Sequence, residues 1–181
     1  MTLPANKDAA SLADSRIKGN LSPQLKFLLE EGLYRVMSTP TLFGASIGKR
    51  IVITEASIVP KAEEASKTEA RVVCELIVRE DMLNPGGSLH GGCAAFLVDI
   101  CSTLVLLASG RSPGVSASMD VVYHAPAAPG AKLRIVNTAM AVGARIMSAR
   151  TEIWDDTTKR LCVTGIHVKM EPSAPKDKAK M

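Results

Sequence analysis

The spacing of apolar and polar residues changes character several times along the chain. Between residues 23 and 34 the apolar side chains recur at helical spacing, as Leu25, Leu28, Leu29 and Leu33. Pro23 suits a first helical turn and Ser22 suits the N-cap before it, so we expect a helix to begin there. Pro40 and Gly44 then break the chain before the next element.

Six later segments have the alternating, β-branched character of strands. They comprise residues 51–59, 70–78, 114–124, 131–142, 145–155 and 159–170. An apolar run at residues 93–108 lies between the second and the third, and a helix that is apolar nearly all round must be buried on most faces. Four successive strands with short turns favour an antiparallel sheet. The pattern therefore predicts an α+β fold, with a curved sheet of about six strands around a long central helix and an extra N-terminal helix.

The chain of 181 residues is long enough for one domain with a substantial core. Residues 1–20 are polar and aperiodic, and residues 171–181 are short and charged. We expect both to be flexible tails on a single domain at residues 21–170. One sheet of six strands leaves open edges, which a homodimer would cover.

Composition excludes several classes of protein. The net charge of +4 comes from interleaved charges without a basic stripe or an aromatic platform, so we expect no nucleic-acid partner. The four cysteines form no CxxC pair, which indicates reduced thiols in an intracellular protein. The N-terminal stretch lacks the apolar segment of a secretory signal. The apolar run is shorter than a bilayer span and is interrupted by Asp99 and Ser102, so we expect no membrane span.

The loop before the central helix has an unusual composition. Residues 84–92 read NPGGSLHGG, with Ser88 as the expected N-cap. The free N–H groups of a helix N-terminus suit an oxyanion or a polarised carbonyl, and Gly91 and Gly92 let a ligand atom approach the backbone closely. A plain tight turn before a helix explains the same residues. A phosphate-binding P-loop does not fit, because no Gly-Lys-Ser/Thr follows.

Asp99 stands in the middle of the apolar run. Burying an unpaired carboxylate costs several kcal/mol, and a buried carboxyl with a raised pKa can serve as a base or a nucleophile. An aspartate bonded to a backbone or hydroxyl partner, or one that faces a wet groove, is the alternative. His90 with Cys93 and Cys101 matches no zinc spacing and lacks a fourth ligand, so we expect neither a metal nor another cofactor.

Gly91 and Asp99 are eight residues apart, which is about 12 Å along a helix at 1.5 Å per residue. Contacts to one reacting carbonyl are near 3 Å, so one helix cannot supply both groups to the same atom. If both act together, Asp99 comes from a second copy of the helix. The spacing then predicts two sites at a dimer interface.

The motif N-x-x-G-x-x-H-G-G at residues 84–92 resembles that of hotdog-fold acyl-CoA thioesterases, of the phenylacetate-degradation and thioesterase-superfamily-member type. The resemblance continues through LVDICSTLVLL and PGVSASMDVVYHAPA and covers roughly residues 25–170. It implies a hotdog fold, dimers that pair into tetramers, and hydrolysis of an acyl-CoA to free acid and CoA. An enoyl-thioester hydratase or dehydratase of the same fold, and a non-catalytic acyl-CoA-binding oligomer, are the alternatives.

The same resemblance implies a role for each residue of the motif. Asp99 corresponds to the acidic general base or nucleophile, and Gly91 to the backbone N–H that polarises the thioester carbonyl. Asn84 corresponds to the amide that orients the water or the carbonyl. His90 corresponds to the histidine beside the carbonyl and the thiolate. Ser116 matches a strand serine that positions the water or the aspartate.

Because the loop before Ser116 is one residue shorter than in similar proteins, Ser118 is the substitute for it. Cations near strand ends are candidates for the nucleotide end of CoA, or are solvated surface charges: Arg145, His167 and Lys169. The substrate-binding residues expected beside the motif are Leu83, Leu89, Gly92 and Met119. The scarcity of aromatic residues favours an aliphatic lining for the acyl group.

The last three residues, Ala179-Lys180-Met181, resemble a variant of the Ser-Lys-Leu peroxisomal signal. A solvated basic end explains them equally well. We expect the protein in the cytoplasm or the peroxisome, with a mitochondrial location still open.

Overall fold

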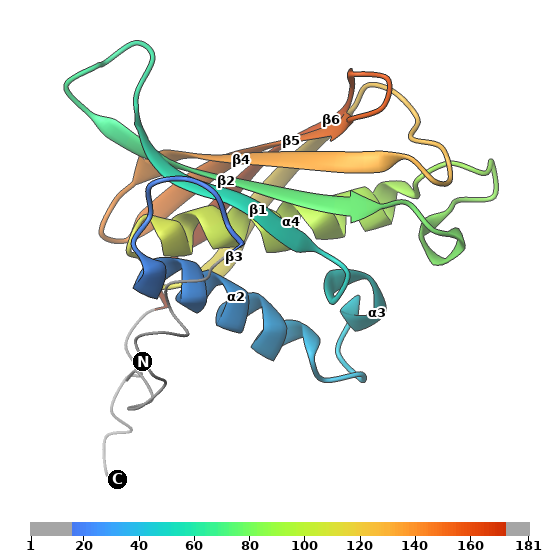
Figure 1. Ribbon diagram of the computed structural model, residues 1–181, viewed down its shortest axis with the longest axis horizontal. Coiled ribbons are helices and arrows are strands. Elements are labelled where there is room, and N and C mark those ends of the chain that lie inside the picture. Colours follow the sequence, from blue (N-terminus) through green and yellow to red (C-terminus); the bar gives the residue numbers. More distant parts are fainter. Residues whose placement is uncertain (1–15, 173–181) are drawn as a thin grey trace, which may run out of the picture.

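The computed structural model describes residues 16–172, and residues 1–15 and 173–181 lie outside the described part. The first helix, α2 (Pro23–Met37), begins where the sequence predicts, because Ser22 Oγ accepts a hydrogen bond from Leu25 N at 3.3 Å. A one-turn helix, α3 (Ala45–Gly48), follows. Together the two helices form a layer beneath the rest of the molecule (Figure 1).

Within residues 16–172, six strands form one antiparallel sheet, as predicted. They are β1 (Val52–Pro60), β2 (Thr68–Ile77), β3 (Val115–Tyr123), β4 (Lys132–Val142), β5 (Ile146–Asp155) and β6 (Arg160–Met170). Their order is β1-β2-β4-β5-β6-β3, and each neighbouring pair is antiparallel. The strand β3 therefore lies at the edge beside β6, although β4 follows it in sequence.

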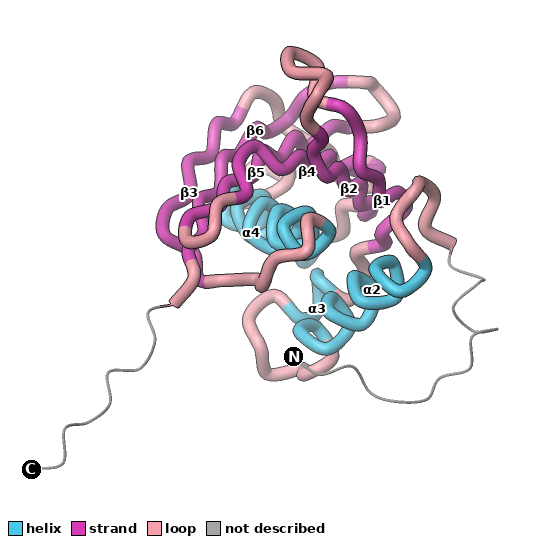
Figure 2. The backbone as a smooth tube through the Cα atoms, turned by 90° about the vertical axis from the view of Figure 1, so that its left-hand side faces the viewer, coloured by secondary structure: helices cyan, strands magenta, loops and turns pink. Residues whose placement is uncertain are grey.

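The central helix, α4 (Gly91–Ala108), lies in the hollow of the curved sheet. Figure 2 shows the sheet bent over α4, with α2 and α3 on the opposite side of the helix. Leu97, Val98 and Val105 are completely buried between these layers. The structure thus confirms the α+β class, the six strands around one helix and the additional N-terminal helix.

Helix and sheet approach most closely at Gly165 in β6. A Cβ atom at this position would lie 2.5 Å from Val98 Cγ1, well inside a normal contact. Only a glycine allows α4 to pack at this depth without moving either element.

A buried hydrogen-bonded tie joins three neighbouring strands. Thr151 Oγ1 in β5 donates to Asn137 Oδ1 in β4 at 2.7 Å, and Asn137 Nδ2 donates to the carbonyl of Val72 in β2 at 3.1 Å. Asn137 and Thr151 are completely buried. Both of these buried polar side chains therefore have partners, as burial requires.

Among the described residues, α4 is the one helix long and apolar enough to cross a bilayer, with a mean hydropathy of 2.0. More than half of it is buried inside the protein, against the sheet and α2. Its apolar composition is what a core helix requires.

The packed part of the chain begins before residue 21. Ile17 is buried, and Lys18 exchanges backbone hydrogen bonds with Thr54 and Ala56 in β1. The predicted N-terminal tail of residues 1–20 therefore ends too late in the chain. Ile17 already packs in the core, although the residues around it in sequence are polar. Residues 1–15 of that tail and residues 173–181 lie outside the described residues.

Candidate active site

The helix α4 begins with a histidine cap. His90 Nδ1 accepts a hydrogen bond from Gly92 N at 2.9 Å, so His90 and not the expected Ser88 is the N-cap. Ser88 instead closes the preceding loop, where its N–H donates to Asn84 Oδ1 at 3.2 Å and its carbonyl accepts from Asn84 N at 2.8 Å. Gly91 is the first helical residue, so its N–H has no acceptor within the helix.

The carbonyl of Gly91 is tied to the edge strand. Tyr123, near the end of β3, donates its hydroxyl to Gly91 O at 3.0 Å. Its ring also stands 3.4 Å from where a Cβ of residue 91 would lie. Sequence reasoning missed Tyr123, because nothing in the strand pattern shows that the end of β3 reaches the start of α4.

Asp99 is half-exposed, with 43% of its side chain accessible, so the expectation of a buried carboxylate is wrong. The apolar residues beside it in sequence, such as Val98, point to other faces of the helix, because successive positions are about 100° apart. The structure agrees with the alternative reading, in which the aspartate faces a groove.

Two polar side chains hold the Asp99 carboxylate. Ser116 Oγ in β3 donates to Asp99 Oδ1 at 3.4 Å, and His167 Nε2 in β6 lies 3.6 Å from the same oxygen. His167 Nε2 is also 3.0 Å from Ser116 Oγ, and His167 Nδ1 is 2.7 Å from Ser102 Oγ. In the described part of the chain, Ser116 and not Ser118 supplies the hydroxyl bonded to this carboxylate. A β-bulge between Ser116 and Ser118 shifts the register of β3 at this point.

His167 and Lys169 are not the surface cations that the sequence suggested. His167 is completely buried and Lys169 is 6% exposed, with its Nζ donating to Thr103 Oγ1 at 3.1 Å. Burial lowers the pKa of His167, the Lys169 cation lowers it further, and Asp99 opposes both effects. Burial also lowers the pKa of Lys169, with Asp99 again opposing. Of the three expected CoA contacts, Arg145 alone is exposed, in the turn between β4 and β5.

The alternation of buried and more exposed positions along β6 indicates that His167 and Lys169 are buried. His167 and Lys169 share a strand face with Val163 and Gly165, and that face packs on α4. This alternation therefore predicts that both side chains face the protein core. Their position near the end of a strand had suggested that they lie on the protein surface.

A pocket of about 410 Å³ opens beside Asp99. Two of the residues predicted to bind substrate, Met119 of β3 and Gly92 of α4, line it. Leu83 and Leu89 do not, because they pair with one another in a short bridge and pack on the main core. The lining that the sequence did not predict comes from α2 and the loop after it, including Met37 and Phe43.

The predicted residues thus form two groups at different points of α4. Asp99 and Ser116 meet at the middle of the helix, and Asn84, His90 and Gly91 lie at its N-terminus. The rise between Gly91 and Asp99 is about 12 Å, as the spacing requires. Within residues 16–172, no three His, Cys, Asp or Glu side chains cluster in a way that would hold a metal ion.

Comparison with known proteins identifies the family. The family model described as Thioesterase superfamily matches residues 86–162. Acyl-coenzyme A thioesterase 13 of Mus musculus is 34% identical over 113 residues, which are 62% of this chain and 81% of that protein. The Homo sapiens protein of the same name matches to the same extent, with 34% identity and the same coverage.

Solved structures lead to the same family. Zebrafish thioesterase superfamily member 2 is 28% identical, with a TM-score of 0.66 over 79% of this chain and 96% of that one. The phenylacetic acid degradation protein PaaI of Thermus thermophilus, 19% identical, shares the fold with a TM-score of 0.57 over 72% of this chain and 98% of its own. With its hotdog fold and its aspartate on the central helix, this chain belongs to the thioesterase superfamily.

Proposed function

We propose that this protein is an acyl-CoA thioesterase, which hydrolyses an acyl-CoA thioester to a free acid and CoA. The observation that carries the proposal is the Asp99 carboxylate, held by Ser116 at the wall of an apolar pocket. A half-exposed carboxylate beside an apolar cavity can activate a water molecule against a bound acyl group. The similarity to acyl-coenzyme A thioesterase 13 supports a CoA ester as the substrate.

In the proposed reaction, Asp99 accepts a proton from water while the water oxygen forms a bond to the thioester carbon. The negative charge that develops on the carbonyl oxygen is received by the N–H of Gly91 at the positive end of the helix. The C–S bond then breaks, and the thiolate leaves with the proton that Asp99 accepted. Direct attack by Asp99 on the thioester carbon is the alternative first step.

The hydrogen bonds of His90 and His167 determine which ring nitrogen of each carries a proton. Because His90 Nδ1 accepts from Gly92, the neutral His90 ring carries its proton on Nε2, where it can donate to the carbonyl or the thiolate. For Ser116 to donate to Asp99, its oxygen must accept from His167 Nε2–H. His167 Nδ1 then accepts the one hydroxyl proton of Ser102 at 2.7 Å, in competition with the Asp99 backbone carbonyl, which lies 3.1 Å from the same hydroxyl. This hydrogen-bonded chain, buried at Ser102 and His167, therefore orients the catalytic carboxylate.

A complete site requires two copies of the chain, since one α4 cannot bring Gly91 and Asp99 to one carbonyl. The edge strand β3 exposes large apolar side chains, namely Val115, Met119, Val122 and Tyr123. Antiparallel pairing of two β3 edges would cover them and set two α4 helices side by side in opposite directions. Asp99 would then lie opposite the partner subunit's Gly91. Pairing of dimers into tetramers remains a prediction.

The experiment that tests the activity is thiol release from short, medium, long and aromatic acyl-CoAs, with wild type beside Asp99→Asn. Asparagine keeps the shape of the side chain and removes the base, so we expect release to fall about 10²- to 10⁴-fold. Circular dichroism and gel filtration would show that the variant is folded. No release from any thioester by the wild type would overturn the proposal. Water addition to an enoyl-CoA would then indicate a hydratase, and binding without turnover a carrier.

Labelled water separates the two forms of the first step. In a single turnover in H₂¹⁸O, a general base gives an acid that contains the label. Attack by Asp99 itself gives a mixed anhydride, and water that opens it at the Asp99 carboxyl carbon leaves an unlabelled acid and ¹⁸O in Asp99. Label in Asp99 is therefore diagnostic of attack, whereas water that adds to the acyl carbon labels the acid as a general base would.

We also propose that the protein acts in the cytoplasm or the peroxisome, supported by the resemblance of Ala179-Lys180-Met181 to a peroxisomal signal. These residues lie outside the described part of the chain. A fluorescent protein fused to the full chain, with and without the final tripeptide, tests this. Identical diffuse distributions would leave the cytoplasm as its place.

A further inference from the structure

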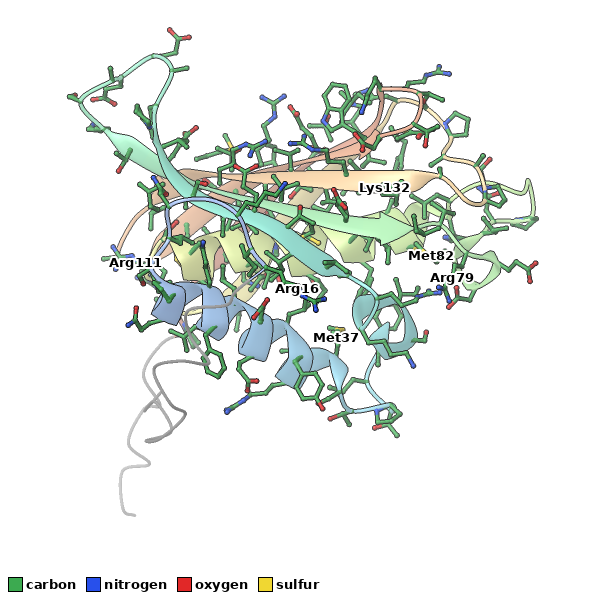
Figure 3. The ribbon with its side chains drawn as sticks, viewed as in Figure 1. Arg16, Met37, Arg79, Met82, Arg111 and Lys132 are labelled. Carbon is green, nitrogen blue, oxygen red and sulfur yellow. The ribbon has the colours of Figure 1, made fainter. Side chains whose placement is uncertain are left out.

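Residues 38–44, between α2 and α3, pass directly over the α4 face that carries Asp99, and we call this segment the strap. Its two ends are anchored by close contacts of glycines. At one end, a Cβ on Gly48 would lie 2.0 Å from Met37 Sδ, and the side chain of Met37, the last residue of α2, lies between α2 and α3 (Figure 3). At the other end, a Cβ on Gly44 would lie 2.4 Å from the Phe96 ring. The strap is thus fixed against α4 by the side chain that precedes Asp99 by one helical turn.

The contact between strap and helix is aromatic. The Phe43 and Phe96 rings meet edge to face, with centroids 5.6 Å apart and an interplanar angle of 79°. Phe96 is 8% exposed, whereas Phe43 is 84% exposed. Both rings line the Asp99 pocket, so the exposed Phe43 is an apolar wall that a ligand would cover.

The rest of the lining is apolar as well. Met37, Ala95, Ile100 and Met119 contribute carbon and sulfur atoms, and among residues 16–172 Asp99 is the one ionisable side chain in the wall. Away from Asp99, a hydroxyl on the acyl group would lose water without a side-chain partner, and a carboxylate on it would be repelled by Asp99. The lining therefore favours an unsubstituted hydrocarbon chain.

We infer that the strap forms the end wall of the acyl subsite, and that Phe43 and Phe96 determine which chain lengths are accepted. The volume of about 410 Å³ holds roughly a dozen groups of the size of water, at about 30 Å³ each, and a methylene group is of similar size. The preferred substrates are then straight aliphatic acyl-CoAs of about eight to twelve carbons. This inference rests on the proposed thioesterase function.

Two substitutions of opposite effect test the inference. Phe43→Ala opens the end wall at an exposed position, where the fold depends little on the side chain. Ala95→Leu, one turn from Asp99 on the pocket side of α4, fills the subsite. Tyr34→Ala is the matched control, because Tyr34 is exposed on α2 and does not line the pocket.

The readout is the ratio of kcat/KM for a sixteen-carbon acyl-CoA to that for an eight-carbon one. We expect Phe43→Ala to raise this ratio about tenfold and Ala95→Leu to lower it about tenfold, since a fit that differs by a methylene group is worth at least that factor. Release from a four-carbon ester, which is too short to reach the wall, should change less than about twofold. Tyr34→Ala should keep the wild-type ratio.

An unchanged ratio in both pocket variants, or an equal loss at every chain length, would overturn the inference while leaving the thioesterase intact. If the wild type hydrolyses no thioester, the proposed function fails instead. In that case, S-alkyl-CoA thioethers of eight and sixteen carbons, measured by calorimetry, test the wall by affinity. Equal effects of both substitutions on the two thioethers would then overturn it.

Discussion

At the scale of single residues, the site depends on which backbone N–H groups are available as hydrogen-bond donors. The Gly91 N–H is free because the helix begins there, and the His90 cap takes the N–H of Gly92 instead. His90 has φ of −64° and ψ of 134°, an extended conformation. This conformation is also the one that a residue before proline adopts, and proline is well accepted at the first helical position. The Gly91 N–H can therefore be removed while the helix remains.

We expect Gly91→Pro to reduce kcat/KM for an acyl-CoA by about 10²- to 10³-fold, the usual effect of losing one oxyanion donor. Gly91→Ala is the control, because it keeps the N–H and brings its Cβ only to 3.4 Å from the Tyr123 ring. Steady-state thiol release from both variants measures the difference. Equal activity of the two would show that this N–H does not bind the carbonyl oxygen.

The buried His167 links stability to pH. Burial lowers the pKa of His167 in the folded protein below the usual 6.5, so the unfolded chain binds a proton that the folded chain resists. The free energy of unfolding should therefore fall as pH decreases through 6.5, with a slope from this group of at most about 1.4 kcal/mol per pH unit. Urea unfolding at pH 7.5 and 5.5 measures it. His167→Gln should reduce the pH dependence, and an undiminished slope in that variant would contradict the assignment.

At the scale of elements, glycines determine how near α4 can come to its neighbours. Gly165 faces Val98 at a distance that no side chain permits. Gly32, in α2, faces Leu107 of α4 with ordinary space, since a Cβ there would lie 3.8 Å from Leu107 Cδ1. The two positions should respond to alanine in opposite ways.

We expect Gly165→Ala to lower the free energy of unfolding by about 1–3 kcal/mol, because the added methyl group overpacks the boundary between helix and sheet. Gly32→Ala should raise it by about 0.5–1 kcal/mol, because alanine is the better helix former. Chemical denaturation of both variants tests the pair. A Gly165→Ala protein as stable as wild type would mean that α4 lies farther from β6.

Periodicity was sufficient to predict the six strands and the two long helices, because each segment has the spacing of the face it buries, but it did not predict α3, whose four residues are too few to show a period. All six strands, α2 with its Ser22 cap and the central helix follow from that spacing. What it could not give are properties that depend on neighbours distant in sequence. Asp99 is half-exposed because its face of α4 borders a pocket, and the Ser116 contact depends on β3 pairing with β6. The position of the strap over the pocket could not be predicted, because the sequence of a loop does not show which part of the protein the loop packs against.

At the scale of the whole molecule, the exposed β3 edge and the two separated groups of site residues have one explanation. Two chains joined at β3 would cover the apolar edge and complete both sites at once. Each site would then take Asp99 from one chain and Gly91 from the other.

Mixed dimers test this arrangement. Asp99→Asn and Gly91→Pro chains, each inactive alone, should regain about a quarter of wild-type activity after equal mixing and reassembly. Half of random dimers are mixed, and one of their two sites is intact. Two differently tagged Asp99→Asn chains mixed in the same way are the control. Mixed dimers that are purified by both tags and remain inactive would show that each chain contains its own complete site.

The buried tie from Thr151 through Asn137 to Val72 has a consequence for how the sheet assembles. A strand shifted by one residue turns every side chain to the opposite face. If β5 slips by one residue along β4, Thr151 turns outward while Asn137 stays buried without this partner, and a buried amide that loses its partner costs about 1–3 kcal/mol. This free-energy cost destabilises misaligned sheets and leaves the native sheet unaffected. Asn137→Val would thus be expected to leave the native fold standing while allowing more misregistered chains during refolding.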